Sequence, residues 1–365
     1  MKLIINCKDD MLPIERAKAI MSGKDYDRVP FDPYLGEIKA RYIGKSIKNY
    51  WLDEENLVSA EIEAFNKYGM DGMCIGPNAI GISEAIGAEI CYPENGRPYV
   101  KSSAIKNIKD VKYLDVINEK SKGIEKYYNA TSRIRSIGDN ICPVSVSLSG
   151  PLTLASFILG SENFLKSTIK QPEDAYILLS YIFECIKFIV DKFSALDVSF
   201  SIADPMASNT VISPRVYKKF AFPFTQKICE YVEKMSGKLP SYHVCGNTKK
   251  SWELIKELRI GVFSIDNEID IFEACNEFSN THIIAGNVDP LNIICKGSKE
   301  SIDFAVKQSL MAGKTCGKGF ILTPGCNLPL ETKDENIEFF LDAGRKHSYI
   351  IKTRYWRLII CRKMY

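Results

Sequence analysis

Short apolar runs alternate with longer stretches of mixed polar and apolar residues along most of the chain. Short runs bounded by glycine, proline or polar residues are typical of buried strands, whereas the longer mixed stretches are typical of helices. We therefore expect eight short strands, each followed by a helical segment. The expected strands are 28–35, 72–77, 143–148, 199–203, 239–244, 262–266, 281–286 and 319–322.

This alternation predicts an α/β protein with a parallel sheet. Eight strand-helix units are the number in a closed (β/α)8 TIM barrel, here with an N-terminal helical extension. An open doubly wound sheet is the alternative, but no G-x-G-x-x-G motif follows the first strand. The expected helical stretches are 11–22, 37–67, 119–135, 151–193, 213–236, 248–258, 298–312 and 334–346.

The connection after the second strand, 78–142, departs from the regular pattern. Asn95-Gly96 lies there between apolar runs and predicts a hairpin insertion. We expect a single barrel domain over 1–348, followed by a basic, aromatic tail over 349–365. The tail fits either a solvated tail or last helix, or a contact with a membrane or with another protein.

Composition narrows the class of protein. The chain of 365 residues is 45% hydrophobic and 25% charged, close to the averages for globular domains. Its 48 basic and 45 acidic residues give a net charge of +3, too balanced to argue for nucleic acid or membrane binding. No apolar run approaches the ~18 residues of a membrane span, and no signal peptide is apparent. We expect a cytoplasmic protein whose twelve cysteines are thiols or metal ligands.

Two of these cysteines and one histidine fall at strand ends. His243 and Cys245 are two residues apart, so they point to the same face of the expected fifth strand. Cys326 follows the eighth strand. Free cysteines are often simply buried, and H-x-C alone is weak evidence for a metal. In a barrel, however, the fifth and eighth strands both end at the same rim, so Cys326 would lie near His243 and Cys245.

Three protein ligands that leave a fourth position open describe a catalytic zinc rather than a structural one. Two thiolates and one imidazole also select zinc over magnesium or calcium. A substrate thiol entering the open position would be deprotonated and would become a nucleophile. Activation of water for hydrolysis is the less natural alternative, because thiolate ligands make zinc a weaker acid.

Polar residues, glycine and proline gather wherever an expected strand meets its loop. In a TIM barrel the active site is built at that face. We therefore expect Ser149, Asp204 and Asn287 to bind substrate. The alternative is that such residues make good turns.

Several motifs carry a resemblance to the uroporphyrinogen decarboxylase superfamily. The chain more closely resembles its zinc methyltransferase branch, the methylcobamide:coenzyme M methyltransferases, from about 15 to 345. That branch is marked by H-x-C with a distant C, matched by His243, Cys245 and Cys326. The shared motifs are Asp27-Arg28-Val29-Pro30, Gly150-Pro151-Leu152-Thr153-Leu154-Ala155, Ala203-Asp204-Pro205, Ala285-Gly286-Asn287-Val288-Asp289-Pro290 and Gly325-Cys326-Asn327-Leu328-Pro329.

The resemblance implies a zinc-bound thiolate that attacks the methyl group of a corrinoid carried by a partner protein. The acceptor would be a small thiol such as coenzyme M or homocysteine. Family members can also fill the open zinc position with an acidic residue after strand six, and Asp266 matches that position. An ordinary turn residue is the alternative for Asp266.

Two other functions stay open. The first is decarboxylation of a porphyrinogen, but the decarboxylases carry an arginine-rich signature after strand one, and here no arginine follows until Arg41. The second is a corrinoid-linked binding or scaffold protein with a closed, structural zinc site.

Overall fold

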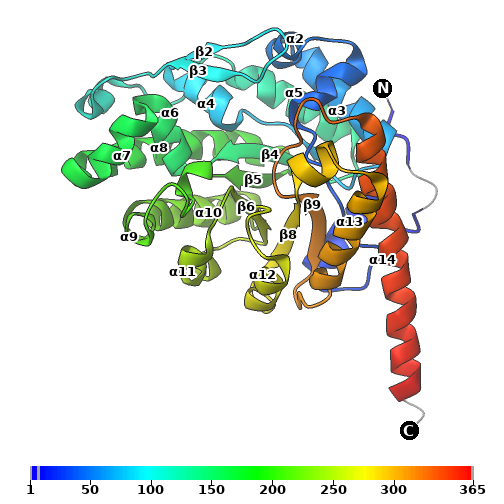
Figure 1. Cartoon of the computed structure of the whole chain (residues 1–365). Coiled ribbons are helices and arrows are strands. Elements are labelled where there is room, and N and C mark those ends of the chain that lie inside the picture. Colours follow the sequence, from blue (N-terminus) through cyan, green and yellow to red (C-terminus); the bar gives the residue numbers. More distant parts are fainter. Residues whose placement is uncertain (1, 6–8, 363–365) are drawn as a thin grey trace.

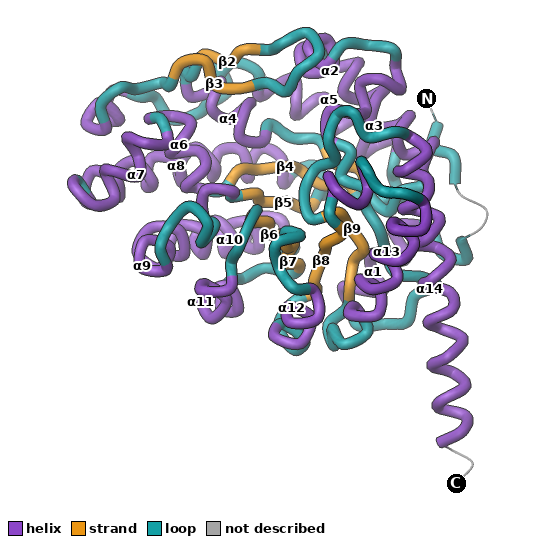
Figure 2. The backbone as a smooth tube through the Cα atoms, viewed as in Figure 1, coloured by secondary structure: helices purple, strands orange, loops and turns teal. Residues whose placement is uncertain are grey.

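The described part of the chain folds around one parallel sheet. The computed structural model describes residues 2–5 and 9–362, with side chains as far as Ser348. Seven strands of this part form the sheet in the order β1-β4-β5-β6-β7-β8-β9, and the sheet curls while helices cover its outside (Figures 1 and 2). The strands are β1 (Met73–Cys74), β4 (Val144–Ser149), β5 (Ser199–Ala203), β6 (Ser241–Val244), β7 (Val262–Ile265), β8 (Ile283–Val288) and β9 (Phe320–Pro324).

The eighth unit is reduced to a single bridge. Phe31 pairs in parallel with Leu322 of β9, through hydrogen bonds from Leu322 N–H to Pro30 O and from Asp32 N–H to Leu322 O. A longer ladder would need the N–H groups of Pro30 and Pro324 as its next donors, and proline has none. The expectation of a full strand over 28–35 is therefore wrong in extent. The (β/α)8 barrel architecture is confirmed.

Helices pack on the outside of the sheet, and the expected hairpin is present beyond β1. Its strands are β2 (Glu89–Cys91) and β3 (Tyr99–Ser102), which pair antiparallel. The helices are α1 (Pro13–Met21), η1 (Gly36–Ile43), α2 (Ile47–Leu52), α3 (Glu54–Tyr68), α4 (Asn78–Ile86), η2 (Ile108–Tyr113), α5 (Ile124–Ile137), α6 (Pro151–Leu159), α7 (Ser161–Lys170), α8 (Pro172–Ser194), η3 (Pro205–Ala207), α9 (Pro214–Val216), η4 (Tyr217–Ala221), α10 (Phe222–Ser236), η5 (Lys249–Ser251), α11 (Trp252–Glu257), α12 (Ile271–Glu277), η6 (Pro290–Cys295), α13 (Lys299–Gly313) and α14 (Asp334–Arg362).

Some helix boundaries differ from the sequence prediction. The single stretch expected over 37–67 is broken at Gly44, whose φ of 63° ends η1, and again before α3, where the Asp53 side chain accepts a hydrogen bond from Asn56 N–H. The short helix α12 was not expected. The last helix does not end near Gly344 but continues to Arg362, and its C-terminal half extends past the rest of the chain (Figure 1).

Most of the predicted tail over 349–365 is therefore helical, while residues 363–365 lie outside the described part. No helix formed by the described residues is long and apolar enough to cross a membrane.

Side chains alternate strictly between the two faces of the central strands. The outward positions of β4 to β7 are apolar and fully buried under the helices. The inward positions are mostly serine, and all but two of them keep some accessible surface. The strand registers place this inward row on one face: Ser145, Ser147, Ser149, Ser199, Ser201, Ser241, His243 and Ser264.

A buried ion-pair network holds the segment that closes the barrel. Arg16 pairs with Asp27, and both Arg16 and Arg28 pair with Asp71, which directly precedes the β1 region. Asp71 also accepts a hydrogen bond from Phe31 N–H, at 2.8 Å. The Asp27-Arg28 motif thus fixes the chain immediately before Asp32 and Tyr34, which enter the barrel.

Candidate metal centre

Three side chains meet at the carboxyl end of the barrel. His243 belongs to β6, Cys245 follows that strand directly, and Cys326 follows β9. The His243 Nε2 atom lies 3.2 Å from Cys245 Sγ, and the two sulfurs lie 3.7 Å apart. All three ligand atoms fall within 4.8 Å of one another, and each side chain is half-buried. The structure thus brings together the trio that the sequence singled out.

The spacing of the three atoms fits one zinc ion. Two sulfurs that each lie ~2.3 Å from a tetrahedral zinc are ~3.8 Å apart. The observed sulfur separation of 3.7 Å agrees with that value. One imidazole and two thiols are also the donor set that zinc prefers. His243, Cys245 and Cys326 could therefore hold zinc with little rearrangement.

The two thiols differ in acidity. The pKa of Cys326 is lowered, chiefly because Cys245 donates a hydrogen bond to its sulfur. The pKa of Cys245 is raised, first because its proton is shared with Cys326 and then because it is buried. The lowered pKa of Cys326 favours its thiolate, which is the form that binds metal.

The other nitrogen of the histidine has a partner that sequence reasoning missed. His243 Nδ1 lies 3.0 Å from Ser264 Oγ, on the neighbouring strand β7. The sequence holds the signal for this contact, because Val262-Phe263-Ser264-Ile265 alternates, and its register pairs His243 with Ser264 on the inner face. A hydrogen bond at Nδ1 leaves Nε2 directed at the cysteines.

A comparison with protein families covers nearly all of this architecture. The model of the uroporphyrinogen decarboxylase family matches residues 12–347. The chain belongs to the uroporphyrinogen decarboxylase family.

The named relatives are of two kinds, methyltransferases and decarboxylases. The methylcobamide:CoM methyltransferase MtbA of Methanosarcina mazei is 26% identical, covering 69% of this chain and 73% of that protein. The methylated-thiol–coenzyme M methyltransferase of the same organism is 23% identical, covering 92% and 90%. The uroporphyrinogen decarboxylase of Rickettsia rickettsii is 28% identical, covering 86% and 90%. A solved methyltransferase from Methanosarcina mazei shares the fold, with a TM-score of 0.82 and 20% identity over 92% of this chain and 99% of that one.

The three residues that we expected to bind substrate are largely engaged by the protein itself. Asp204 accepts hydrogen bonds from the N–H groups of Leu152 and Thr153, at 3.2 and 2.8 Å, at the start of α6. Burial raises the pKa of Asp204 to about 6. The Asn287 amide donates to the carbonyls of Asp266 and Ile269 and so shapes the loop after β7.

Ser149 is buried at the end of β4, and its hydroxyl donates at 3.4 Å to Gly150 O. Substrate contact by Ser149, Asp204 and Asn287 stays a prediction.

Asp266 lies beside the centre without belonging to the close trio. It follows β7, is only 9% exposed, and accepts a hydrogen bond from Glu268 N–H at 2.9 Å. Its negative charge contributes to the raised pKa of Cys245. Asp266 is thus near enough to interact electrostatically with Cys245. Its role as a fourth ligand stays a prediction.

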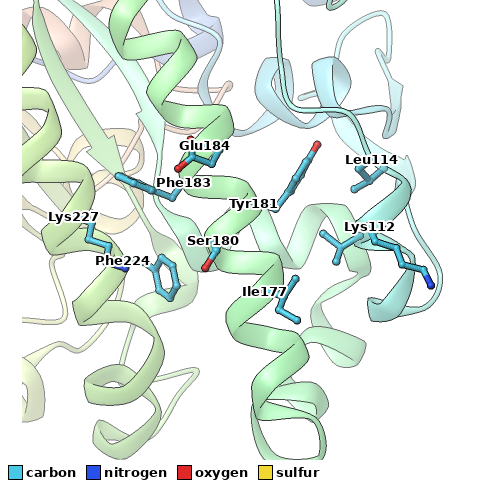
Figure 3. Close-up of a pocket in the computed structure, with 10 residues that line it drawn as sticks. Lys112, Leu114, Ile177, Ser180, Tyr181, Phe183, Glu184, Phe224 and Lys227 are labelled. Carbon is cyan, nitrogen blue, oxygen red and sulfur yellow. The ribbon is translucent and has the colours of Figure 1, made fainter.

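A groove of about 740 Å³ lies elsewhere, on the outside of the barrel. Figure 3 shows that Ile177, Ser180 and Tyr181 line it from α8, while Phe224 and Lys227 come from α10. None of its lining residues belongs to the trio. The histidine His282 is also remote, because it precedes β8 at the opposite end and contacts Leu258 O.

Proposed function

We propose that this protein is a zinc-dependent methyltransferase that moves a methyl group from a methylated corrinoid to a small thiol. The observation that carries the proposal is the cluster of His243, Cys245 and Cys326 inside the carboxyl end of a barrel. The names of two relatives support it, since both are coenzyme M methyltransferases and one acts on methylcobamide. The corrinoid would be carried by a partner protein.

The chain's own residues supply positions and charge for this reaction. Zinc, when bound, would keep the acceptor sulfur in its thiolate form at neutral pH, where a free thiol of pKa ~8.5 is mostly protonated. The lowered pKa of Cys326 favours its thiolate, and Ser264 holds the ring of His243 by its Nδ1 atom. The serine row below the trio keeps accessible surface, so it offers hydroxyl groups to the rest of a small thiol.

Methyl transfer then needs only one displacement. A new sulfur–carbon bond forms while the cobalt–carbon bond breaks, and both electrons of that bond stay on cobalt. Holding the sulfur in line with the methyl group accounts for much of the rate gain in such a step. The site at the strand ends is open to the loops of the rim, where a corrinoid on a second protein could approach.

Zinc content and methylcobalamin turnover test the proposal. Purified protein should hold close to one zinc per chain and convert methylcobalamin plus a thiol into the thioether and cob(I)alamin, followed by visible absorption. His243→Ala should abolish both, while His282→Ala, a buried histidine at the far end, should retain both. Zinc that is bound but never supports turnover with any small thiol would instead indicate a structural zinc and a scaffold role.

Porphyrinogen decarboxylation is the second candidate, favoured by the 28% identity to a uroporphyrinogen decarboxylase. A substrate with many carboxylates needs several convergent cations. In the described structure, Arg41 instead pairs with Asp334 and donates to Thr332 O, while the buried Lys39 pairs with Glu61. Decarboxylation of a porphyrinogen by wild-type protein, without thiol methylation, would replace our proposal with this one.

A further inference from the structure

Tyr34 has a main chain that is unusual for a large residue. Its φ is 46°, in the left-handed region that bulky side chains rarely adopt. Two hydrogen bonds hold it there. The Asp32 carboxylate accepts from Tyr34 N–H at 2.9 Å, and Tyr34 O accepts from Leu328 N–H at 3.0 Å. Leu328 lies two residues beyond Cys326, so Tyr34 is tied to the loop of that ligand.

This backbone sends the Tyr34 ring across the inside of the barrel. Tyr34 follows the segment paired with β9, yet its hydroxyl lies 3.2 Å from Ser264 Oγ on β7. Ser264 Oγ lies in turn 3.0 Å from His243 Nδ1.

Metal binding selects one direction for this chain of hydrogen bonds. To bind a metal, His243 Nε2 must offer its lone pair, so the ring proton must lie on Nδ1. His243 Nδ1–H then donates to Ser264 Oγ, and the Ser264 hydroxyl can donate in turn to the Tyr34 oxygen. This arrangement leaves the lone pair on Nε2, which faces Cys245.

We propose that Tyr34 and Ser264 are positioning residues that set the tautomer and the ring orientation of His243 for metal binding. Neither touches the reacting atoms. Burial raises the pKa of Tyr34 to about 12, so its hydroxyl stays protonated and able to donate at neutral pH. Because Tyr34 is tied to the Cys326 loop through Leu328, the same residue links the positions of ligands from β6 and β9. This inference rests on the metal site of the proposed function, but not on methyl transfer.

The first test needs no metal. The chain contains three histidines, so nitrogen NMR of ¹⁵N-histidine-labelled, metal-free protein gives few signals. Wild-type His243 should carry its proton on Nδ1. Tyr34→Phe keeps the ring and removes the hydroxyl, and Ser264→Ala breaks the chain at its middle, so both should give a mixture of tautomers. Wild type with the proton on Nε2, or variants with an unchanged tautomer, would overturn the proposal.

The second test measures zinc affinity by competition with a chelator. Loss of a partner of a ligating histidine commonly weakens metal binding by about 10–100-fold. We expect Ser264→Ala and Tyr34→Phe to fall in or just below that range. The double variant should be no weaker than Ser264→Ala alone, because both changes break one chain.

The matched control for Tyr34→Phe is Tyr231→Phe, whose hydroxyl contacts Asp191 on the outside of the barrel. This variant should bind zinc as the wild type does. Additive losses in the double variant, or a Tyr34→Phe affinity equal to that of the control, would overturn the proposal. The outcome is separable from the proposed function, because a protein with these tautomers and affinities that never transfers methyl would refute only the latter.

Discussion

The two faces of strands β4 to β7 differ more than any other neighbouring regions of the molecule. On the outer face Val146, Ile202, Val244 and Phe263 are entirely buried under the helices. On the inner face serines and His243 alternate with them along the same strands, and all of them except Ser149 and Ser264 keep accessible surface. The interior of a TIM barrel is ordinarily filled by bulky branched side chains. Here the packed layer lies outside the strands, and the inner row consists mostly of small polar side chains.

Removing a large side chain from the outer face should have the largest effect on stability. Phe263 stacks 6.4 Å from Tyr242 and packs 5.0 Å from Phe278, ring centroid to centroid. Phe263→Ala would leave a cavity between the sheet and the helices, so we expect a loss of about 3–5 kcal/mol in the free energy of unfolding. Urea denaturation followed by circular dichroism measures it.

The matched inner-face variant is Ser241→Ala, on the strand beside Phe263. It removes one hydroxyl from a partly exposed position, so we expect a change of no more than about 0.5 kcal/mol. Equal losses for Phe263→Ala and Ser241→Ala would contradict the division of labour between the faces.

The next largest effect on stability is expected from the buried carboxyl group of Asp204, and this effect depends on pH. Burial raises the folded-state pKa of Asp204 to about 6, above its unfolded value of ~3.9. Between these values the folded protein binds more protons than the unfolded one, so stability falls as the pH rises from about 4 to above 6. The shift of ~2 units corresponds to a loss of up to about 3 kcal/mol.

Asp204→Asn should lack this part of the pH dependence. Urea unfolding of both proteins at several pH values between 4 and 7 gives the difference directly. If the two stability curves stay parallel across that range, the Asp204 carboxyl does not titrate as burial implies.

The sequence was sufficient to predict the order of the strands and the convergence of His243, Cys245 and Cys326, because both follow from local alternation. Apolar runs gave the strand positions, and period two placed His243 and Cys245 on one face. The first strand could not be bounded in this way, since its pairing depends on prolines in two distant segments, Pro30 and Pro324.

The hydrogen-bond partners around His243 could also not be predicted from the sequence. Tyr34 reaches Ser264 across 230 positions of the chain, through a backbone conformation that no propensity suggests. Asp204 read as a substrate residue because it stands at a strand exit. Its carboxylate accepts from the first turn of α6, a contact that only the packed structure reveals, while substrate contact by Asp204 stays a prediction.

On the inner face, removing a charge beside His243, Cys245 and Cys326 should have a moderate effect on zinc affinity. We expect Asp266→Asn to weaken zinc binding by about tenfold without thiol, since a nearby carboxylate favours the cation and can take the fourth position. With saturating thiol the loss should shrink, because the thiol would occupy that position. The control is Asp270→Asn in the same loop, whose carboxylate only accepts from Glu273 N–H. An equal loss with and without thiol would refute Asp266 as an exchangeable ligand.

A small effect on stability is also expected where a side chain is enlarged on the inner face. Ser201 on β5 is inward and partly exposed, so Ser201→Leu would place its side chain in accessible space rather than against packed atoms. We expect a loss below about 1 kcal/mol, less than the 1–3 kcal/mol usual when a packed core is overfilled. The matched change is Ala155→Leu in α6, where the alanine is fully buried and the full penalty should appear. Ser201→Leu should nevertheless weaken thiol acceptance, measured as a raised KM for the thiol, because it fills the space beneath the ligands. If both leucine variants destabilise the protein equally, the inside of the barrel is as tightly packed as its outer layer, and the thiol must lie elsewhere.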